Sequence, residues 1–373
     1  MKFKIKKDIL LNNLTAVSRA ISNKNLIPIL SGIKFDLNED GLYLTCSDND
    51  IMIQSLIPTD DISEIEELGS IVISGRYVVD IIRKLPNEDI LIDVVDGLKI
   101  LINTTNSSFT LNGMNASDFP KTEFENSPNK TLINKKVFKN IINQTSFAAS
   151  TQESRPLLTG INFKVENDVL ECLATDSYRL AKKEIKLTDK ISEMISVVIP
   201  SRNLNELIKV FDDEEGDAEI HLFSNKVIFK FDNIIFRTKI LSGTYPDTSK
   251  LIPEEFMLTI EVDTTEFYNV IDRASLLNND RDKNIVNLEV SGDEMLITSV
   301  SQEIGKVEER MIITKDNSEN IKISFSARFM LEAIRALQCE TMEIRLNGDV
   351  KPIILKEKDG DNMTQLILPI KTY

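Results

Sequence analysis

Three short segments of the chain follow one pattern at a fixed spacing. In each, an apolar run (SIVI, SVVI or KISF) leads within a few residues to an arginine and then to a helical pattern of apolar residues. The arginines are Arg76, Arg202 and Arg328, so both intervals are 126 residues. Self-similarity at a fixed period indicates a repeat architecture. The chain of 373 residues is therefore predicted to contain three copies of one unit.

A second set of positions supports the same period. Leu10, Phe138 and Phe267 each open an amphipathic helical pattern, at intervals of 128 and 129 residues. After Leu10 the apolar positions recur at steps of four, three and four, which places them on one face of an α-helix. Each copy is thus predicted to carry two helices.

Between the two helices of each copy lie runs with the alternation of β-strands. The segment GIKFDLNEDGLYLTCSD (32–48) matches GINFKVENDVLECLATD (160–176) at an offset of 128, and VNLEVSGDEMLITSVSQ (286–302) has the same alternation. The predicted fold class is α+β, with two helices per copy packed on antiparallel sheets. The domains are predicted at 1–125, 128–247 and 252–373. Asn- and Pro-rich segments at 121–130 and 242–256 are the predicted linkers.

The charge of the chain argues against nucleic acid at first sight. There are 44 basic and 59 acidic residues, a net charge of −15, whereas affinity for DNA comes largely from Lys and Arg that neutralise phosphates. One basic face on an acidic body would reconcile the two. Cys46, Cys172 and Cys339 have neither disulfide nor zinc spacing and are predicted to be reduced thiols in strands, as in a cytoplasmic protein. No signal peptide and no run of the ~20 apolar residues that span a bilayer is visible.

No catalytic constellation is visible in the sequence. The single histidine, His221, lies in an alternating segment and is predicted to be structural, and no nucleotide- or metal-binding motif occurs. Asp48 and Asp176 hold equivalent positions in the first two copies; paired carboxylates can do acid–base chemistry, but recurrence at the repeat period favours caps of turns. The chain is predicted not to be an enzyme and to need no cofactor and no metal.

The repeated arginines allow two interpretations. Each lies near a predicted helix N-terminus, where a cation opposes the helix dipole. Each could pair with a neighbouring acid or cover apolar surface with its stem. Alternatively, the three could face an external anion.

With the triple repeat established, the sequence resembles the bacterial DNA sliding clamps, the beta subunit of DNA polymerase III. The resemblance runs over the whole length. Its more specific pieces are IPILSGIKF (27–35), NASDFP (115–120), QESRPLLTGINF (152–163), LATDSYRLA (173–181), SGTYPDTSKLIP (242–253) and QLILPIKTY (365–373).

The resemblance implies three domains of the DNA-clamp (processivity) fold in a head-to-tail dimeric ring, with helices inside and sheets outside. Helix dimensions favour a ring made of two chains over a ring made of one. Six helices of roughly 10–12 Å around a circle leave a hole of about 10 Å, and twelve leave about 30 Å, enough for a duplex of about 20 Å. The implied function is that of a DNA polymerase processivity factor, which encircles duplex DNA without sequence preference. The implied partners are a replicative polymerase, the clamp loader, repair polymerases and mismatch-repair proteins at the nucleoid, and no membrane.

Two sets of binding residues follow from matching positions. The DNA-contacting set is Lys24, Gln152 and Arg202. Some members of the family have aromatic residues after the matching arginine, where this chain has Pro156 and Leu157. The second set forms a groove between copies two and three for short linear peptide motifs. Its members are Arg155, Leu158, Thr175, Tyr178, Arg179, Leu180, Pro246, Lys250, Leu251, Pro369, Ile370 and Lys371. The chain has Ser177-Tyr178 where Gly-His is frequent, and lysine at 250 and 371 where arginine is frequent. Partner preference is expected to shift, because Lys lacks the bidentate fork of Arg.

For the dimer contact the resemblance implies Phe109 and Leu111 against Leu276 and Leu277. The charged flanks have opposite signs, with Arg76, Arg83 and Lys84 in the first copy and Glu303, Glu308 and Glu309 in the third. Without the resemblance, an acidic repeat scaffold that binds peptides and never meets DNA is the alternative function. An enzyme that uses Asp48 and Asp176 is a third.

Overall fold

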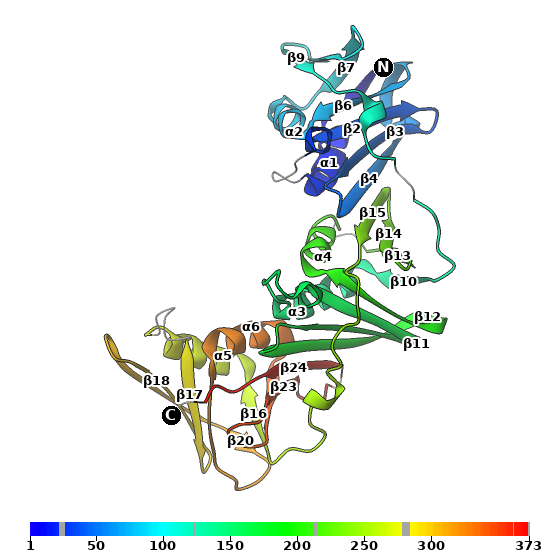
Figure 1. The fold of residues 1–373 in the computed structure, drawn as a ribbon. Coiled ribbons are helices and arrows are strands. Elements are labelled where there is room, and N and C mark those ends of the chain that lie inside the picture. Colours follow the sequence, from blue (N-terminus) through cyan, green and yellow to red (C-terminus); the bar gives the residue numbers. More distant parts are fainter. Residues whose placement is uncertain (22–26, 122–123, 212–214, 278–283, 361, 372–373) are drawn as a thin grey trace. The chain divides into compact units, whose positions relative to one another are not determined.

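The computed structural model describes residues 1–21, 27–121, 124–211, 215–277, 284–360 and 362–371, without the side chains of 188–193. The chain forms two compact units. Unit 1 is Met1–Phe138 with Arg202–Ile240, and unit 2 is Lys139–Ser201 with Leu241–Tyr373. The central predicted repeat, drawn in cyan to green in Figure 1, therefore contributes to both units.

Six α-helices occur in the described part of the chain, two for each predicted repeat, as the apolar periodicity predicts. They are α1 (Lys7–Val17), α2 (Gly75–Lys84), α3 (Lys135–Thr145), α4 (Ser201–Ile208), α5 (Thr264–Ser275) and α6 (Ala327–Leu337). Short 3-10 helices are η1 (Ser18–Ala20), η2 (Pro28–Ser31), η3 (Thr59–Asp61), η4 (Ala116–Asp118), η5 (Ser146–Ala148), η6 (Pro156–Thr159) and η7 (Ser249–Leu251). Arg76, Arg202 and Arg328 each lie in the first turn of a helix, as predicted.

Unit 1 contains a five-stranded and an eight-stranded sheet. The first has the order β5-β1-β7-β8-β9 and the second β10-β13-β14-β15-β4-β3-β2-β6, with antiparallel pairing throughout. The strands are β1 (Lys2–Lys6), β2 (Gly32–Asn38), β3 (Gly41–Ser47), β4 (Ile51–Pro58), β5 (Ile62–Glu67), β6 (Gly69–Ser74), β7 (Asp89–Val95), β8 (Lys99–Asn103), β9 (Ser108–Asn112), β10 (Lys130–Asn134), β13 (Asp217–Leu222), β14 (Lys226–Phe231) and β15 (Ile234–Lys239).

Two different repeats share the eight-stranded sheet. Strand β15 of the central repeat pairs with β4 of the first, with Phe236 opposite Ile53. Both side chains are fully buried, and helix α1 packs against β4. The apolar positions of β2 alternate with more exposed ones, because successive side chains of a strand point to opposite faces.

Unit 2 is built around a long hairpin, visible in green in Figure 1. Its two strands, β11 (Gly160–Thr175) and β12 (Arg179–Pro200), have 16 and 22 residues. They belong to a seven-stranded sheet of order β11-β12-β24-β23-β22-β16-β20; a four-stranded sheet has the order β19-β18-β17-β21. The other strands are β16 (Leu258–Asp263), β17 (Ile285–Ser291), β18 (Glu294–Ser301), β19 (Gly305–Ile312), β20 (Thr314–Lys315), β21 (Ile321–Ser326), β22 (Thr341–Leu346), β23 (Ile353–Glu357) and β24 (Met363–Ile367).

The central and third repeats join through β12 and β24, with Leu180 opposite Leu366. Helices α5 and α6 pack against each other and bury Phe267, Met330 and Ile334 in the main core of the unit. Asp263 caps α5, since its side chain accepts a hydrogen bond from the Glu266 N–H at 2.7 Å.

One pair of glycines shows the repeat at the level of packing. A Cβ on Gly32 would lie 2.4 Å from Val72 Cγ1, and a Cβ on Gly160 would lie 2.6 Å from Val198 Cγ1. Both distances are far below van der Waals contact. The glycines and the valines each recur at the repeat period, so the same close approach of two strands is built twice.

The cysteines follow the prediction in two cases out of three. Cys46 lies in β3 and Cys172 in β11, both fully buried, but Cys339 lies in the loop after α6 rather than in a strand. All three thiols are free. Within the described residues, no helix has the length and apolar character needed to cross a membrane.

Candidate functional site

The residues predicted for a peptide groove all lie in unit 2, on four of its segments. These segments are η6 with the residues before it, the turn between β11 and β12, the stretch 245–252, and the residues after β24. Leu180 belongs to a small apolar cluster with Leu173, Ile354 and Leu366, against which Tyr245 and Ile252 pack. The chain after β24 continues its pairing, since the Leu368 N–H donates to the Tyr178 carbonyl at 2.9 Å.

The predicted groove residues divide into a buried set and an exposed set. Leu158, Thr175, Arg179 and Leu180 are buried, and Pro369 and Ile370 are half-buried. Tyr178 is 63% exposed and Leu251 47% exposed, so both leave apolar surface in contact with water. The exposed polar members are Arg155, Lys250 and Lys371. Apolar side chains beside a cationic rim suit a segment with an apolar anchor.

A cavity of about 500 Å³ lies beside these residues. Its walls include Leu173, Tyr245, Pro246 and Ile252, together with Lys182. The Tyr245 hydroxyl accepts a hydrogen bond from the Thr175 N–H at 3.1 Å, which ties the 242–256 segment to the end of β11. Burial raises the pKa of Tyr245 to about 12, so the hydroxyl stays protonated at neutral pH.

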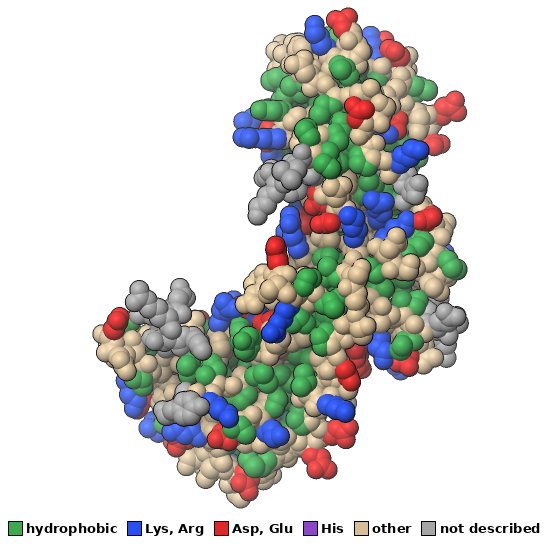
Figure 2. All heavy atoms as spheres, viewed as in Figure 1, with side chains coloured by type: hydrophobic (Ala, Val, Ile, Leu, Met, Phe, Trp, Pro, Cys, Tyr) green, Lys and Arg blue, Asp and Glu red, His purple; other side chains and the backbone are tan. Residues whose placement is uncertain are grey.

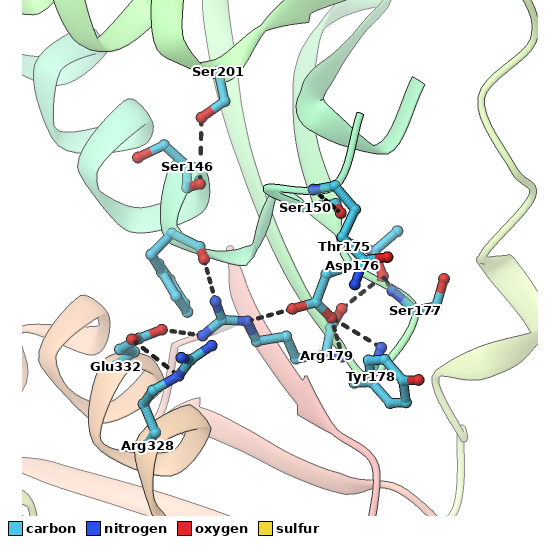
Figure 3. Close-up of polar contacts among 12 residues, drawn as sticks. Ser146, Ser150, Thr175, Asp176, Ser177, Tyr178, Arg179, Ser201, Arg328 and Glu332 are labelled. Atoms are coloured by element: carbon cyan, nitrogen blue, oxygen red, sulfur yellow. Dashed lines mark hydrogen bonds and ion pairs between the residues drawn. The ribbon is translucent and has the colours of Figure 1, made fainter. Parts of the chain in front are cut away.

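The turn from Thr175 to Arg179 is held by its own side chains (Figure 3). Asp176 Oδ1 accepts hydrogen bonds from the N–H groups of Tyr178 (2.9 Å) and Arg179 (3.1 Å). Ser177 has a left-handed backbone with φ of 79°, which costs a side-chain-bearing residue energy. Its hydroxyl accepts a hydrogen bond from Arg155 Nη1 at 3.1 Å. Ser177 therefore also contacts an arginine of the predicted groove rim.

Arg179 does not lie on the groove surface. It is 7% exposed, and its guanidinium donates to Asp176, to Glu332 and to the Phe147 carbonyl. Its position in the sequence predicts a peptide-contacting residue, since it matches a groove position of the resembled family. No pattern in the sequence points to Glu332, which is 153 residues away along the chain.

The predicted DNA-contacting residues are distributed over the chain. Lys24 lies outside the described residues. Gln152 is exposed in unit 2, just before η6. Arg202 is exposed in unit 1 and lines a polar cavity of about 350 Å³ with Arg19, Asn203 and Glu206.

One of the three repeated arginines pairs with a neighbouring acid, as the first interpretation predicts. Arg328 Nε lies 3.8 Å from Glu332 on the same helix. The side chains of Arg76 and Arg202 make no hydrogen bond or ion pair with any other described residue. On the face drawn in Figure 2, basic and acidic side chains are interspersed rather than separated.

The residues predicted for a dimer contact lie on an edge strand in the first repeat and after a helix in the third. Phe109 and Leu111 belong to β9, the edge of the five-stranded sheet, where Phe109 joins Tyr77, Ile81 and Leu85 around an apolar cavity of about 310 Å³. Leu276, 74% exposed, and the half-buried Leu277 follow α5.

Three of the six charged residues predicted to flank the dimer contact, Arg83, Glu308 and Glu309, have partners within the chain. Glu309 receives both Nε and Nη2 of Arg273, at 2.9 and 2.8 Å. Arg83 lies 3.1 Å from Asp80, and Glu308 pairs with Lys306. Any pairing across a dimer must compete with these contacts.

Comparison with known proteins identifies the family. The sequence matches the DNA polymerase III beta subunit in all three of its domains: the N-terminal domain over 1–123, the central domain over 132–247 and the C-terminal domain over 249–371. The chain belongs to the DNA polymerase III beta subunit family.

Individual relatives agree over the full length. The chain is 41% identical to the beta sliding clamp of Staphylococcus aureus (strain Mu50 / ATCC 700699) and 40% identical to that of Staphylococcus epidermidis, with both chains of each pair covered completely. It is similar to the crystal structure of the DNA polymerase sliding clamp from Bacillus subtilis, with a TM-score of 0.97, 39% identity and complete coverage of both chains. Its function is that of a DNA polymerase processivity factor, which is not an enzyme.

The polar residues that first suggested chemistry have structural roles in this clamp-family chain. Asp48 Oδ1 accepts hydrogen bonds from the N–H groups of Asp50 and Ile51, the same turn that Asp176 makes one repeat later, which confirms the prediction of turn caps. His221 Nδ1 accepts from the Ser127 N–H at 3.1 Å and holds the linker before β10. Among the described residues, no cluster of His, Cys, Asp and Glu is suited to a metal ion.

Proposed function

We propose that two copies of this clamp chain close head to tail into a ring around duplex DNA and hold partner proteins through the groove of unit 2. The proposed domains are 1–125, 128–247 and 252–373; the family matches at 1–123, 132–247 and 249–371 support these limits. The proposed partners are the replicative polymerase, the clamp loader, repair polymerases and mismatch-repair proteins, in the cytoplasm at the nucleoid.

The observation that carries the ring is a pair of unlike open edges. Strand β9 in the first repeat and β19 in the third each have one unpaired side. An unpaired edge is a template for another strand. Because the two edges differ, pairing β9 of one copy with β19 of another is a heterologous contact, which closes into a ring when the rotation allows it.

The side chains at the two edges support this pairing. The apolar cavity beside Phe109 is open to a partner, and Leu276 is an exposed apolar side chain that could fill such a space. Phe109 itself is 38% exposed. Covering these side chains removes apolar area from water at each of two equivalent contacts.

DNA contact is proposed for Arg202, Gln152 and Lys24. Arg202 has the chemistry for a phosphate, since it is exposed and unpaired among the described residues. Such contacts position a protein on DNA without reading its sequence. With a net charge of −15, the rest of the surface repels DNA, so retention is expected to come from ring closure rather than from tight binding.

The groove is proposed to bind short linear motifs through an apolar anchor. Leu158 and Leu180 form buried walls, Tyr178 and Leu251 remain exposed, and Arg155 is held at the rim by Ser177. An aromatic or leucine side chain of a partner would cover the exposed apolar groups. The lysines at 250 and 371 are exposed point charges available to polar groups of the same partner.

Retention on closed DNA tests the ring. The chain is loaded by its clamp loader onto a nicked circular plasmid, separated from free protein by gel filtration, and the plasmid is then cut once with a restriction enzyme. A ring is retained on the circle and is lost from the linear form. Equal retention on both forms would indicate ordinary binding, and retention on neither would favour a scaffold that does not meet DNA.

Arg202→Gln separates phosphate contact from topology. The variant is expected to remain on the circle but to show a smaller salt dependence of weak DNA binding, by about one unit of slope for one lost phosphate contact. Arg237→Gln, a change of a half-buried arginine on β15, is the matched control. An unchanged slope for Arg202→Gln would remove this residue from the DNA-contacting set.

A further inference from the structure

Arg179 links two elements of unit 2 that are far apart in sequence (Figure 3). Its Nε donates to Asp176 Oδ2 at 3.0 Å, its Nη2 donates to the Phe147 carbonyl at 2.5 Å, and its Nη1 donates to Glu332 on α6. The guanidinium also lies over the rings of Phe147 and Phe329, at 5.2 and 4.5 Å from their centroids. With three nitrogens engaged and two aromatic rings against it, the group has one well-defined position.

The position of Arg179 determines that of Asp176. One carboxylate oxygen of Asp176 accepts from Arg179 Nε, and the other accepts from the backbone N–H groups of Tyr178 and Arg179. The carboxylate therefore transmits the position of the guanidinium to the backbone of the turn. Tyr178, 63% exposed at the proposed groove, is carried by that backbone.

Glu332 holds the other side of the guanidinium. It lies in α6, and its side chain is 32% exposed. Its Oε2 accepts from Arg179, while its Oε1 lies 3.8 Å from Arg328 Nε. A buried guanidinium that loses one of two carboxylate partners is left poorly compensated and moves toward other acceptors or toward water.

We propose that Glu332 is a positioning residue for the peptide groove: through Arg179 and Asp176 it sets the turn that carries Ser177 and Tyr178. This inference rests on the proposed peptide-binding function of unit 2. Glu332 does not touch the bound segment; it acts through Arg179. Helix α6 thereby becomes part of the groove's support, although the predicted groove residues lie outside it.

The test measures peptide affinity and local backbone protection in the full-length chain. The probe is a fluorescein-labelled hexapeptide ending in Leu-Phe, followed by fluorescence anisotropy, with the same peptide ending in Ala-Ala as the negative probe. Glu332→Ala is expected to weaken binding about tenfold, within the usual 5- to 150-fold range of coupling between sites. Glu332→Gln, which keeps an acceptor but loses the charge, is expected to fall between Glu332→Ala and the unsubstituted chain.

Glu261→Ala is the matched control. Glu261 is 34% exposed and pairs with Lys358 at 2.6 Å in the same unit, but it lies in β16 and not at the turn. Its replacement is expected to leave peptide affinity within about twofold of the unsubstituted chain, as for surface pairs in general.

A second readout separates positioning from general stability. Hydrogen exchange of the segment 173–181 is expected to speed up in Glu332→Ala, because the N–H groups of Tyr178 and Arg179 lose their fixed acceptor, while exchange elsewhere in unit 2 stays close to that of Glu261→Ala. Arg179→Lys keeps the charge but cannot reach three acceptors, and is expected to show the same local change.

The outcomes distinguish the two proposals. If the unsubstituted chain does not bind the Leu-Phe probe, the peptide-binding function itself is overturned. If it binds, and Glu332→Ala binds equally well with unchanged exchange at 173–181, only the positioning role is overturned. A uniform loss of protection across unit 2 would also overturn it, because Glu332 would then support the fold rather than the turn.

Discussion

Truncating Leu276 tests the proposed ring most directly, because most of its side chain is exposed to solvent in the single chain. Leu276 is 74% exposed at the end of α5. Burying a whole leucine side chain contributes about 1.5–3 kcal/mol, so covering the exposed three quarters contributes roughly 1–2 kcal/mol at one contact. A ring of two chains has two such contacts, and Leu276→Ala is expected to cost about 2–4 kcal/mol per dimer.

In the dissociation constant of the dimer, this loss corresponds to a weakening of roughly 30- to 1000-fold, since ~1.4 kcal/mol is a factor of ten. Sedimentation equilibrium over a range of nanomolar to micromolar concentrations measures that constant. Leu68→Ala is the control, because it makes the same substitution at a 47% exposed position between β5 and β6. A dissociation constant of Leu276→Ala within twofold of that of Leu68→Ala would refute the reasoning and place the contact elsewhere.

Three further predictions follow from single contacts. Ser177→Gly relieves a left-handed backbone (φ of 79°) and is expected to raise the free energy of unfolding in urea by about 1 kcal/mol; a decrease would mean that the hydroxyl contributes more than the strain costs. Burial raises the pKa of Cys46 and Cys172, so both thiols should resist iodoacetamide at pH 8 until the chain unfolds, and rapid labelling of the native chain would contradict their burial. The hydrogen bond from Lys130 is the main cause that lowers the pKa of Glu219. The ionised Glu219 carboxylate therefore contributes stability above the ordinary glutamate pKa of 4.5, and this contribution is lost as pH falls through the lowered pKa. Glu219→Gln should therefore destabilise the chain at pH 7 by about 0.5–1 kcal/mol, with a difference that shrinks below pH 4.5; a constant difference from pH 7 to 3 would rule out this ionic contribution.

The sequence predicted the local elements well because their signals are local. Helices α1, α3 and α5 begin three residues before Leu10, Phe138 and Phe267, the residues that open the apolar pattern, and the arginines at 76, 202 and 328 lie in first turns. The role of Asp48 and Asp176 as turn caps also follows from short-range chemistry, since a carboxylate accepts hydrogen bonds from N–H groups two and three residues on.

The pairing of strands across repeat boundaries did not follow from the repeat. The three copies are three domains of the family, but β15 pairs with β4 and β12 with β24 across their boundaries, and the chain therefore groups into two compact units. Edge strands of neighbouring repeats complete each other's hydrogen bonding, and no periodicity within one repeat specifies that partner.

The burial of Arg179 in the predicted site could likewise not be predicted from the sequence. An arginine in a polar stretch is expected at the surface, where most arginines lie. The sequence by itself determined which segments are helices, strands and turns, and that the chain is built three times from one unit. Only the tertiary structure decided that Arg179 is buried between Asp176 and Glu332, because a carboxylate 153 residues away becomes a neighbour only when α6 packs beside the β11–β12 turn.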